Sequence, residues 1–324
     1  MLARVADNLY WMSRYLERSD QTIRLLGVQV RSVTDNTSAQ VAAGWTRLFR
    51  SLKVIPPGGD PLYGDHDEDP FLLADAYTLA DFMSFEQDNP GSMVSLWAMS
   101  RENARQARQE ITQEMWSQLN RTYLSLRDTQ LHFFWNKEPE NFYKETSAQI
   151  YLFRGVTDNG LRHGLAWDFI RLGRFMERIQ VTTEILENYL PALDDEDTDL
   201  DWSLLLRSCA SFEPYCRHYT PEIDPWKVMT FLIHEPESPH TLRFAAEEIR
   251  NGLGRIDPAG GARHPLQAAH RIAGQLRALL VYGSQDREDL GGTLAEVRRL
   301  ARGLHDELYR RYIFYPADQA LPGR

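Results

Sequence analysis

An apolar pattern at the start of the chain constrains the fold more than any other feature. Nine positions recur at alternating spacings of four and three residues, and all but one are apolar: Val5, Leu9, Met12, Leu16, Ser19, Ile23, Leu26, Val30 and Val33. This spacing places them along one side of an α-helix of roughly 30 residues. A helix with such a continuous apolar side must pack against other elements, so the pattern predicts a bundle of long helices.

Helical periodicity continues through the rest of the chain, whereas the alternation typical of strands is nearly absent. Turn residues separate the segments. Further helices are predicted at residues 71–88, 93–110, 112–135, 140–155, 160–190, 201–219, 225–234, 239–254, 264–283 and 290–312. The predicted fold class is therefore all-α.

The length of the chain and its similarity to itself predict an internal duplication. A chain of 324 residues exceeds what one ordinary hydrophobic core supports. Residues 9–26 align without gaps on residues 169–186, and the apolar side stays in phase. Five residues are identical between the two segments: Arg14, Glu17, Arg18, Thr22 and Leu26 correspond to Arg174, Glu177, Arg178, Thr182 and Leu186.

A second match occurs in the same order. Residues 83–96 resemble residues 229–242, and each segment is typical of a helix end, a proline break and a serine that caps the next helix, namely Ser92 or Ser238. We therefore predict two helical pseudo-repeats, residues 1–155 and 156–324. Whether they pack as one body or as two domains stays open.

The composition excludes several classes of function. The net charge of −10 disfavours binding to a nucleic-acid backbone. No apolar run reaches the roughly 18 residues of a membrane span, and Arg4 and Asp7 interrupt the stretch that a signal peptide would need. Two cysteines exclude a disulfide framework. We expect a cytoplasmic protein that binds neither nucleic acid nor membrane.

The first candidate site lies on the two repeated helices. Aromatic and charged residues, among them Tyr10, Arg14, Glu17 and Arg18, occupy the side of the first helix that faces away from its apolar positions, so this side should also be partly covered. One interpretation is a buried ion-pair network between the two helices. The other is a pocket for a carboxylate or a phosphate. The candidate residues are Arg14, Glu17, Arg18, Arg174, Glu177 and Arg178.

A second candidate cluster follows the proline break in the first half. Arg101, Glu102 and Arg105 fall close together on one predicted helix, where an exposed salt-bridge face is the favoured interpretation. The corresponding segment of the second half keeps a glutamate, Glu248, but lacks the two arginines. The divergence suggests a role that only one half performs.

Metal and cofactor chemistry find little support. The one Glu-x-x-His sequence, at residues 237–240, contains a proline at a helix start. Cys209 and Cys216 are predicted to share one face of the helix at 201–219, as core residues. The acidic run at 194–201 lacks the glycine and the closing glutamate of a calcium loop, and nucleotide-binding glycine motifs are missing. We expect no metal and no cofactor.

Several segments resemble the alpha-E family, a group of bacterial proteins of all-helical predicted structure named for a Glu-Arg motif. The resemblance rests on four segments in the family's order: residues 1–20, residues 100–105, residues 114–120 and the second Glu-Arg segment at 173–178. It covers nearly the whole chain. The family context implies a circularly permuted ATP-grasp protein as partner, and often a transglutaminase-like protein.

Two functions of different class follow from that resemblance. ATP-grasp enzymes join a carboxylate to an amine, so the first function is a partner or carboxylate-binding subunit of such a ligase in peptide or amide formation. The second makes the chain itself an amide-transfer enzyme, with Glu17 or Glu177 as a general base. The missing nucleotide motif and nucleophile favour the accessory role.

Overall fold

A computed structural model describes residues 3–57, 75–135, 137–193, 200–258, 267–284 and 286–310. These residues form helices and connecting turns, without strands, which confirms the all-α prediction. The α-helices are α1 (Ala3–Asp35), α2 (Ser38–Leu52), α4 (Ala76–Ser84), α5 (Met93–Gln106), α6 (Gln113–Arg127), α7 (Pro139–Gly160), α8 (Leu165–Tyr189), α9 (Trp202–Ser208), α10 (Phe212–His218), α11 (Pro225–His234), α12 (Leu242–Ile256), α13 (Gln267–Tyr282) and α14 (Leu290–Leu308).

Helix α1 is the long helix that the opening pattern predicts. The predicted apolar positions are buried, apart from Val33 near the end of the helix, which is 38% exposed. The other side of the helix is covered as well, since Tyr10, Glu17 and Gln21 are almost fully buried. A helix buried on both sides lies at the centre of its bundle.

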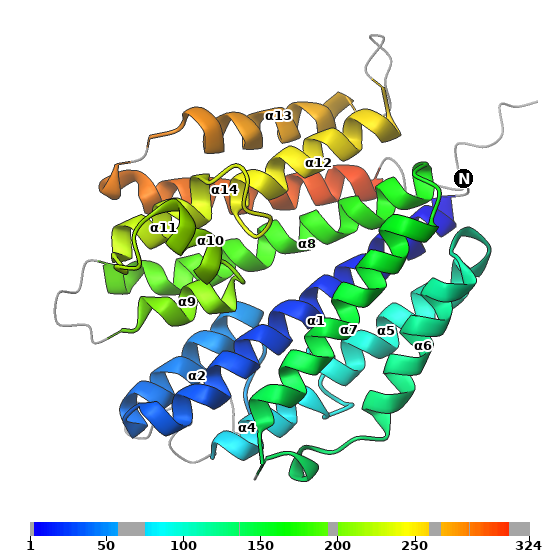
Figure 1. Ribbon diagram of the computed structural model, residues 1–324. Helices are drawn as coiled ribbons and strands as arrows, with labels where there is room; N and C mark the ends of the chain where they lie inside the picture. The colour runs from blue at the N-terminus through cyan, green and yellow to red at the C-terminus, as the bar shows by residue number, and fades with distance from the viewer. Residues whose placement is uncertain are drawn as a thin grey trace, which may run out of the picture.

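Helix α8 lies beside α1 in the middle of the molecule (Figure 1). Their backbones come close at Gly173, where an added Cβ would lie 2.3 Å from the carbonyl oxygen of Tyr10. Only glycine permits this approach, because any side chain would meet the backbone of the other helix. The contact sets the register in which the two Glu-Arg segments face each other.

The remaining helices are arranged around this pair in two similar groups (Figure 1). Helices α5 and α7 pack on α1, and α6 packs on both of them. Helices α12 and α14 pack on α8, and α13 packs on both of these. Two further helices connect the groups, because α2 contacts α8 and α9 contacts α1. Buried apolar residues of both groups form one continuous core.

Several local predictions are wrong. The predicted helices do not include α2, and the helix predicted at 112–135 ends at Arg127. The helix predicted at 201–219 is split into α9 and α10, because Ala210 adopts a left-handed backbone with a φ of 48°. Cys209, which caps the end of α9, and Cys216 in α10 therefore do not share one helix. Ser92 caps α5 as predicted, but α12 begins later than expected, capped by Thr241 and not by Ser238.

The structure also locates the proposed boundary between the two halves and describes only the end of the acidic run. The proposed boundary between residues 155 and 156 falls inside α7, whereas the turn between α7 and α8 lies at residues 161–164. Residues 194–199 of the acidic run are outside the described part of the chain. None of the described helices combines the length and apolar character needed to cross a membrane.

Candidate functional site

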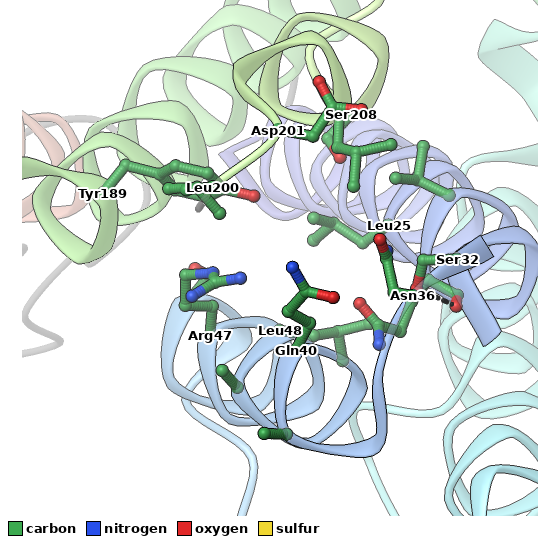
Figure 2. Close-up of a pocket in the computed structure, with 17 residues that line it drawn as sticks. Leu25, Ser32, Asn36, Gln40, Arg47, Leu48, Tyr189, Leu200, Asp201 and Ser208 are labelled. Atoms are coloured by element: carbon green, nitrogen blue, oxygen red, sulfur yellow. Dashed lines mark hydrogen bonds between the residues drawn. The ribbon is translucent and has the colours of Figure 1, made fainter. Parts of the chain in front are cut away.

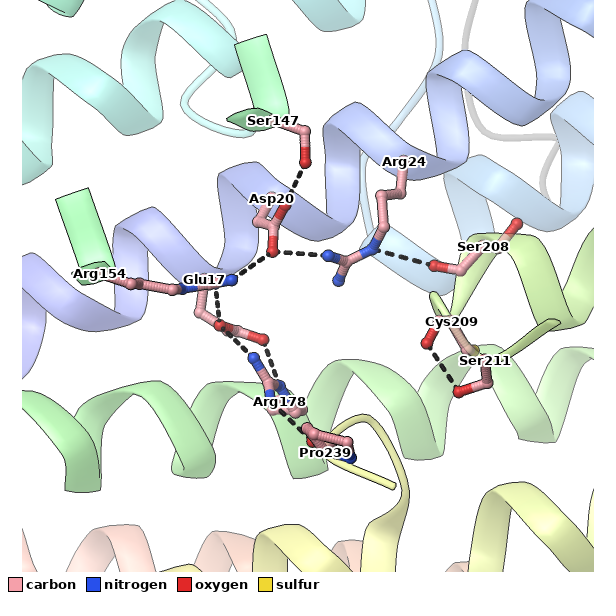
Figure 3. Close-up of polar contacts among 10 residues, drawn as sticks. All are labelled: Glu17, Asp20, Arg24, Ser147, Arg154, Arg178, Ser208, Cys209, Ser211 and Pro239. Carbon is pink, nitrogen blue, oxygen red and sulfur yellow. Dashed lines mark hydrogen bonds and ion pairs between the residues drawn. The ribbon is translucent and has the colours of Figure 1, made fainter. Parts of the chain in front are cut away.

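Glu17 of α1 is fully buried and accepts hydrogen bonds from two arginines of other helices. Arg178 of α8 donates through Nε and Nη2, at 2.6 and 3.0 Å. Arg154 of α7 donates through Nη2 at 2.5 Å. Arg178 also donates to the carbonyl oxygen of Pro239 in the turn before α12, at 2.7 Å (Figure 3). The carboxylate of Glu17 thus ties α1 to α7 and α8.

Glu177 of α8 occupies the corresponding position on the other helix. Arg14 donates to its Oε2 at 2.6 Å, and Arg18 donates to its Oε1 at 2.5 Å, both from α1. Arg14 also donates to the side-chain oxygen of Gln180 at 2.6 Å. The structure thus brings Arg14, Glu17, Arg18, Glu177 and Arg178 together. Both arginines on Glu177 come from α1, whereas those on Glu17 come from α7 and α8.

The two helices do not form matching ion pairs at Arg174, the sixth candidate of this cluster. Arg14 pairs with Glu177, but its counterpart Arg174 forms no ion pair with any described residue, and Arg154 takes that place on Glu17. The Nε of Arg174 is buried beside a cavity of about 20 Å³, room for one water molecule. Burial and repulsion by Arg154 and Arg178 lower the pKa of Arg174 to about 9.

The network continues along α1 to Asp20 and Arg24 (Figure 3). Asp20 is fully buried and accepts from Arg24 at 2.6 Å, Arg154 at 2.9 Å and the Ser147 hydroxyl at 2.9 Å. Arg24 in turn donates to the carbonyl oxygen of Ser208 at 3.2 Å. Charged and polar groups of α1, α7, α8 and α9 are therefore linked in one buried chain of contacts.

The arginines keep the buried carboxylates ionised. Burial alone would raise their pKa values, but Arg178 and Arg154 lower the pKa of Glu17, and Arg14 and Arg18 lower that of Glu177. For Asp20, Arg24 and Arg154 outweigh burial and lower the pKa to about 2. A carboxylate in this state is a poor proton acceptor at neutral pH, because a general base works best with a pKa near the operating pH.

A histidine that no sequence motif marks borders this network. His305 of α14 lies with its Nδ1 3.0 Å from the Tyr10 hydroxyl and 3.1 Å from Nη1 of Arg14. Both groups are donors, so Nδ1 is the acceptor and the ring proton is on Nε2. Burial and the nearby Arg14 lower the pKa of His305, which favours the neutral ring. No sequence signal marks it, because His305 is far from the Glu-Arg segments and has no motif of its own.

The second predicted cluster lies apart from the network, on α5. Arg105 and Glu102 form an exposed pair at 2.6 Å, as the salt-bridge interpretation expects. The neighbouring Arg101 donates to Asn120 of α6 at 2.6 Å and lies over the ring of Tyr123. Arg101 thus joins α5 to α6, whereas Glu102 and Arg105 pair within α5.

A cavity that the sequence did not predict lies between α1, α2, the end of α8 and α9. Its volume is about 300 Å³. Its wall mixes apolar residues, among them four leucines, with polar ones, including Arg47 of α2, Tyr189 of α8 and Gln29 of α1 (Figure 2). Ser208, whose carbonyl oxygen receives Arg24, also borders it. The buried network and the cavity thus share an edge.

Comparison with known proteins gives one family. The model of the Alpha-E family, described as a predicted alpha-helical domain with a conserved ER motif, matches residues 1–313. Uncharacterized proteins of Mycobacterium bovis and of Mycobacterium tuberculosis strain CDC 1551 are each 23% identical over 347 aligned residues. The alignment covers 99% of this chain but 37% of either relative, so the chain spans little more than a third of their length. No solved structure matches.

Proposed function

This chain belongs to the Alpha-E family, and on that premise we propose that it is a non-catalytic, carboxylate-binding partner of a circularly permuted ATP-grasp ligase. The ligase would join a carboxylate to an amine, and this chain would hold a substrate or dock the enzyme. Because ATP is the co-substrate, the pair would act in the cytoplasm.

One observation carries the proposal: each glutamate of the Glu-Arg segments is buried and bound by two arginines. Glu17 and Glu177 have no exposed carboxylate oxygen to offer a substrate, and the arginines lower their pKa values. Either glutamate as a general base would have to break two ion pairs before accepting a proton. The geometry therefore supports a structural role for these segments and disfavours the catalytic alternative.

The length of the relatives supports the idea of a partner. In the mycobacterial proteins the matching region accounts for 37% of the polypeptide. A unit of this kind thus occurs joined to a much longer chain. The partnership we propose would place the same unit beside further protein, as the longer polypeptides of these relatives do.

We also propose that the two halves arose by duplication. Helices α1, α5, α6 and α7 pack in the same order as α8, α12, α13 and α14, and the Glu17–Arg178 and Glu177–Arg18 contacts are reciprocal. Gene duplication explains both similarities at once. Glu17 and Glu177 would then descend from one ancestral residue that paired with its copy.

The test is coexpression with the ATP-grasp protein encoded beside this chain. We expect the two proteins to purify together, no ATP hydrolysis by this chain alone, and amine-dependent ATP turnover by the pair, with the product identified by mass spectrometry. ATP turnover by this chain alone, abolished in a folded Glu17→Gln variant but not by the exposed Glu102→Gln change, would contradict the proposal and favour the catalytic alternative.

A further inference from the structure

We infer that the cavity between α1, α2 and α9 binds a small carboxylate whose apolar body carries an amide, such as an acyl amino acid or a short peptide end. The inference deepens the carboxylate-binding part of the proposed function, on which it rests for its biological purpose. The binding itself depends only on residues of this chain.

The size and walls of the cavity set the class of ligand. At about 300 Å³ it is at the lower limit for small-molecule pockets and too small for a nucleotide or a large cofactor. Leu25, Leu48 and Leu204 form much of the wall. An apolar ligand body would be stabilised here because binding removes its surface from water. A small ligand with an aliphatic side chain suits this space.

One guanidinium supplies the charge. Among the residues lining the cavity, Arg47 is the only cation, and its Nε is buried without a hydrogen-bond partner in the described structure. The guanidinium stacks against the ring of Tyr189, with its carbon 5.4 Å from the ring centroid, which restricts its orientation. Asp201 is the only anion of the lining, and its carboxylate accepts from the backbone N–H of Ser203 at the start of α9. The buried Nε of Arg47 would be stabilised by an anionic acceptor.

A lining with one guanidinium, Arg47, and one carboxylate, Asp201, matches a monocarboxylate better than a phosphate. Arg47 can pair with one ligand carboxylate while Asp201 accepts from the backbone N–H of Ser203, whereas a phosphate would bring further negative charge that no cation of the lining compensates. The planar fork of arginine also fits the two oxygens of a carboxylate. The charge and shape of the site therefore agree on a monocarboxylate.

Side-chain amides suit the amide of the ligand. Gln29 is fixed because its Nε2 donates to the carbonyl oxygen of Val41 at 3.0 Å. Gly44 leaves the room it needs, since a Cβ there would lie 2.3 Å from its Oε1. Figure 2 shows Arg47 and Gln40 reaching from α2 toward the same open space, with Tyr189 across from them. Polar groups of α1, α2 and α8 thus line the cavity beside apolar residues, which suits a ligand that has both polar and apolar parts.

The experiment measures binding to the full chain, without any partner, by titration calorimetry and ligand-detected NMR. The probes are N-acetyl-leucine and N-acetyl-leucine amide, which share the same body and differ only in the carboxylate. We expect the acid to bind at least tenfold more tightly than the amide. Arg47→Met should weaken binding of the acid at least tenfold, whereas Arg50→Met, which removes an exposed arginine of the same helix, should leave it unchanged.

A second variant tests the cavity without touching Arg47. Ala43 is exposed at the edge of the cavity, so Ala43→Trp should block access while leaving the core intact, with at least a tenfold loss of binding and an unchanged melting temperature. Equal binding of acid and amide, no binding of the acid at millimolar concentration, or undiminished binding by folded Arg47→Met and Ala43→Trp variants would overturn the inference. Co-purification with the ATP-grasp protein in spite of these results would leave the partnership standing. Binding of the acid as expected, together with no co-purification, would refute only the partnership.

Discussion

At the scale of single residues, buried carboxylates decide how the centre of the molecule holds together. Glu17 and Glu177 each pair with two arginines, so removing Glu17 leaves Arg178 without a carboxylate partner in a dry site, and removing Glu177 does the same to Arg14. Such a loss costs about 3–5 kcal/mol for a buried pair, against about 1 kcal/mol for an exposed one. The size of the effect therefore separates a buried network from a surface cluster.

We predict that Glu17→Gln and Glu177→Gln each lower the free energy of unfolding by about 3–5 kcal/mol. Because both glutamates act in one network, the double variant should lose less than the sum of the two single losses. Chemical denaturation monitored by circular dichroism gives these values. The matched control is Glu102→Gln on α5, where the exposed pair with Arg105 should cost less than about 1 kcal/mol. Additive losses of that small size at positions 17 and 177 would show that the network does not stabilise the fold.

Asp20 makes the stability depend on pH in a defined direction. Arg24 and Arg154 outweigh burial and hold its pKa at about 2, below the ordinary value of 3.8. A depressed carboxylate pKa stabilises the fold above pH 4, and this contribution, about 2–3 kcal/mol, is lost as the pH falls from 4 to 2. We predict that Asp20→Asn is destabilised at pH 7 and that its difference from the wild type shrinks toward pH 2. Unfolding curves at a series of pH values measure this, and a constant difference would rule it out.

The sequence predicted the members of the network that the two repeats share, since Arg14, Glu17 and Arg18 have counterparts at an offset of 160 residues. It could not predict Arg154, His305 or Arg47. Each of these comes from another helix and has no repeat partner that would single it out. Their roles depend on tertiary packing, which places residues 137 positions apart, such as Glu17 and Arg154, in contact.

At the scale of elements, Gly173 controls how closely α1 and α8 approach. We predict that Gly173→Ala lowers stability by about 1–3 kcal/mol, because the new Cβ would collide with the Tyr10 carbonyl and push the helices apart. The change should also weaken the cross-helix ion pairs, so Glu177→Gln should cost less in that background. Gly155→Ala in α7 is the matched control. A Cβ there meets nothing within 4 Å, so helix propensity should raise stability by about 0.5–1 kcal/mol. A stability gain at both glycines would exclude a close contact at Gly173.

The positions of most helices followed from periodicity alone, as at α11, where the predicted range 225–234 agrees with the structure. The failures have a local cause. Apolar spacing passes smoothly through residues 209–211, and only the left-handed backbone of Ala210, which nothing in the residue type signals, separates α9 from α10. Caps are similarly ambiguous where Ser238 and Thr241 both precede a helix.

At the scale of the whole molecule, one core runs through both halves, so they should not fold alone. We predict that the full chain unfolds in a single transition, coincident by circular dichroism and tryptophan fluorescence. Fragments 1–162 and 163–324, cut in the turn between α7 and α8, should each lack a cooperative transition, because each exposes the apolar face and the unpaired charges of its central helix. Coexpressed, they should form a one-to-one complex, since α1 and α8 can still pair. The combined changes Glu17→Gln in one fragment and Glu177→Gln in the other should prevent this assembly, whereas Glu102→Gln should not. If either fragment alone unfolded cooperatively with the stability of the full chain, the halves would be independent domains, and the ion pairs between α1 and α8 would be an interface and not a shared core.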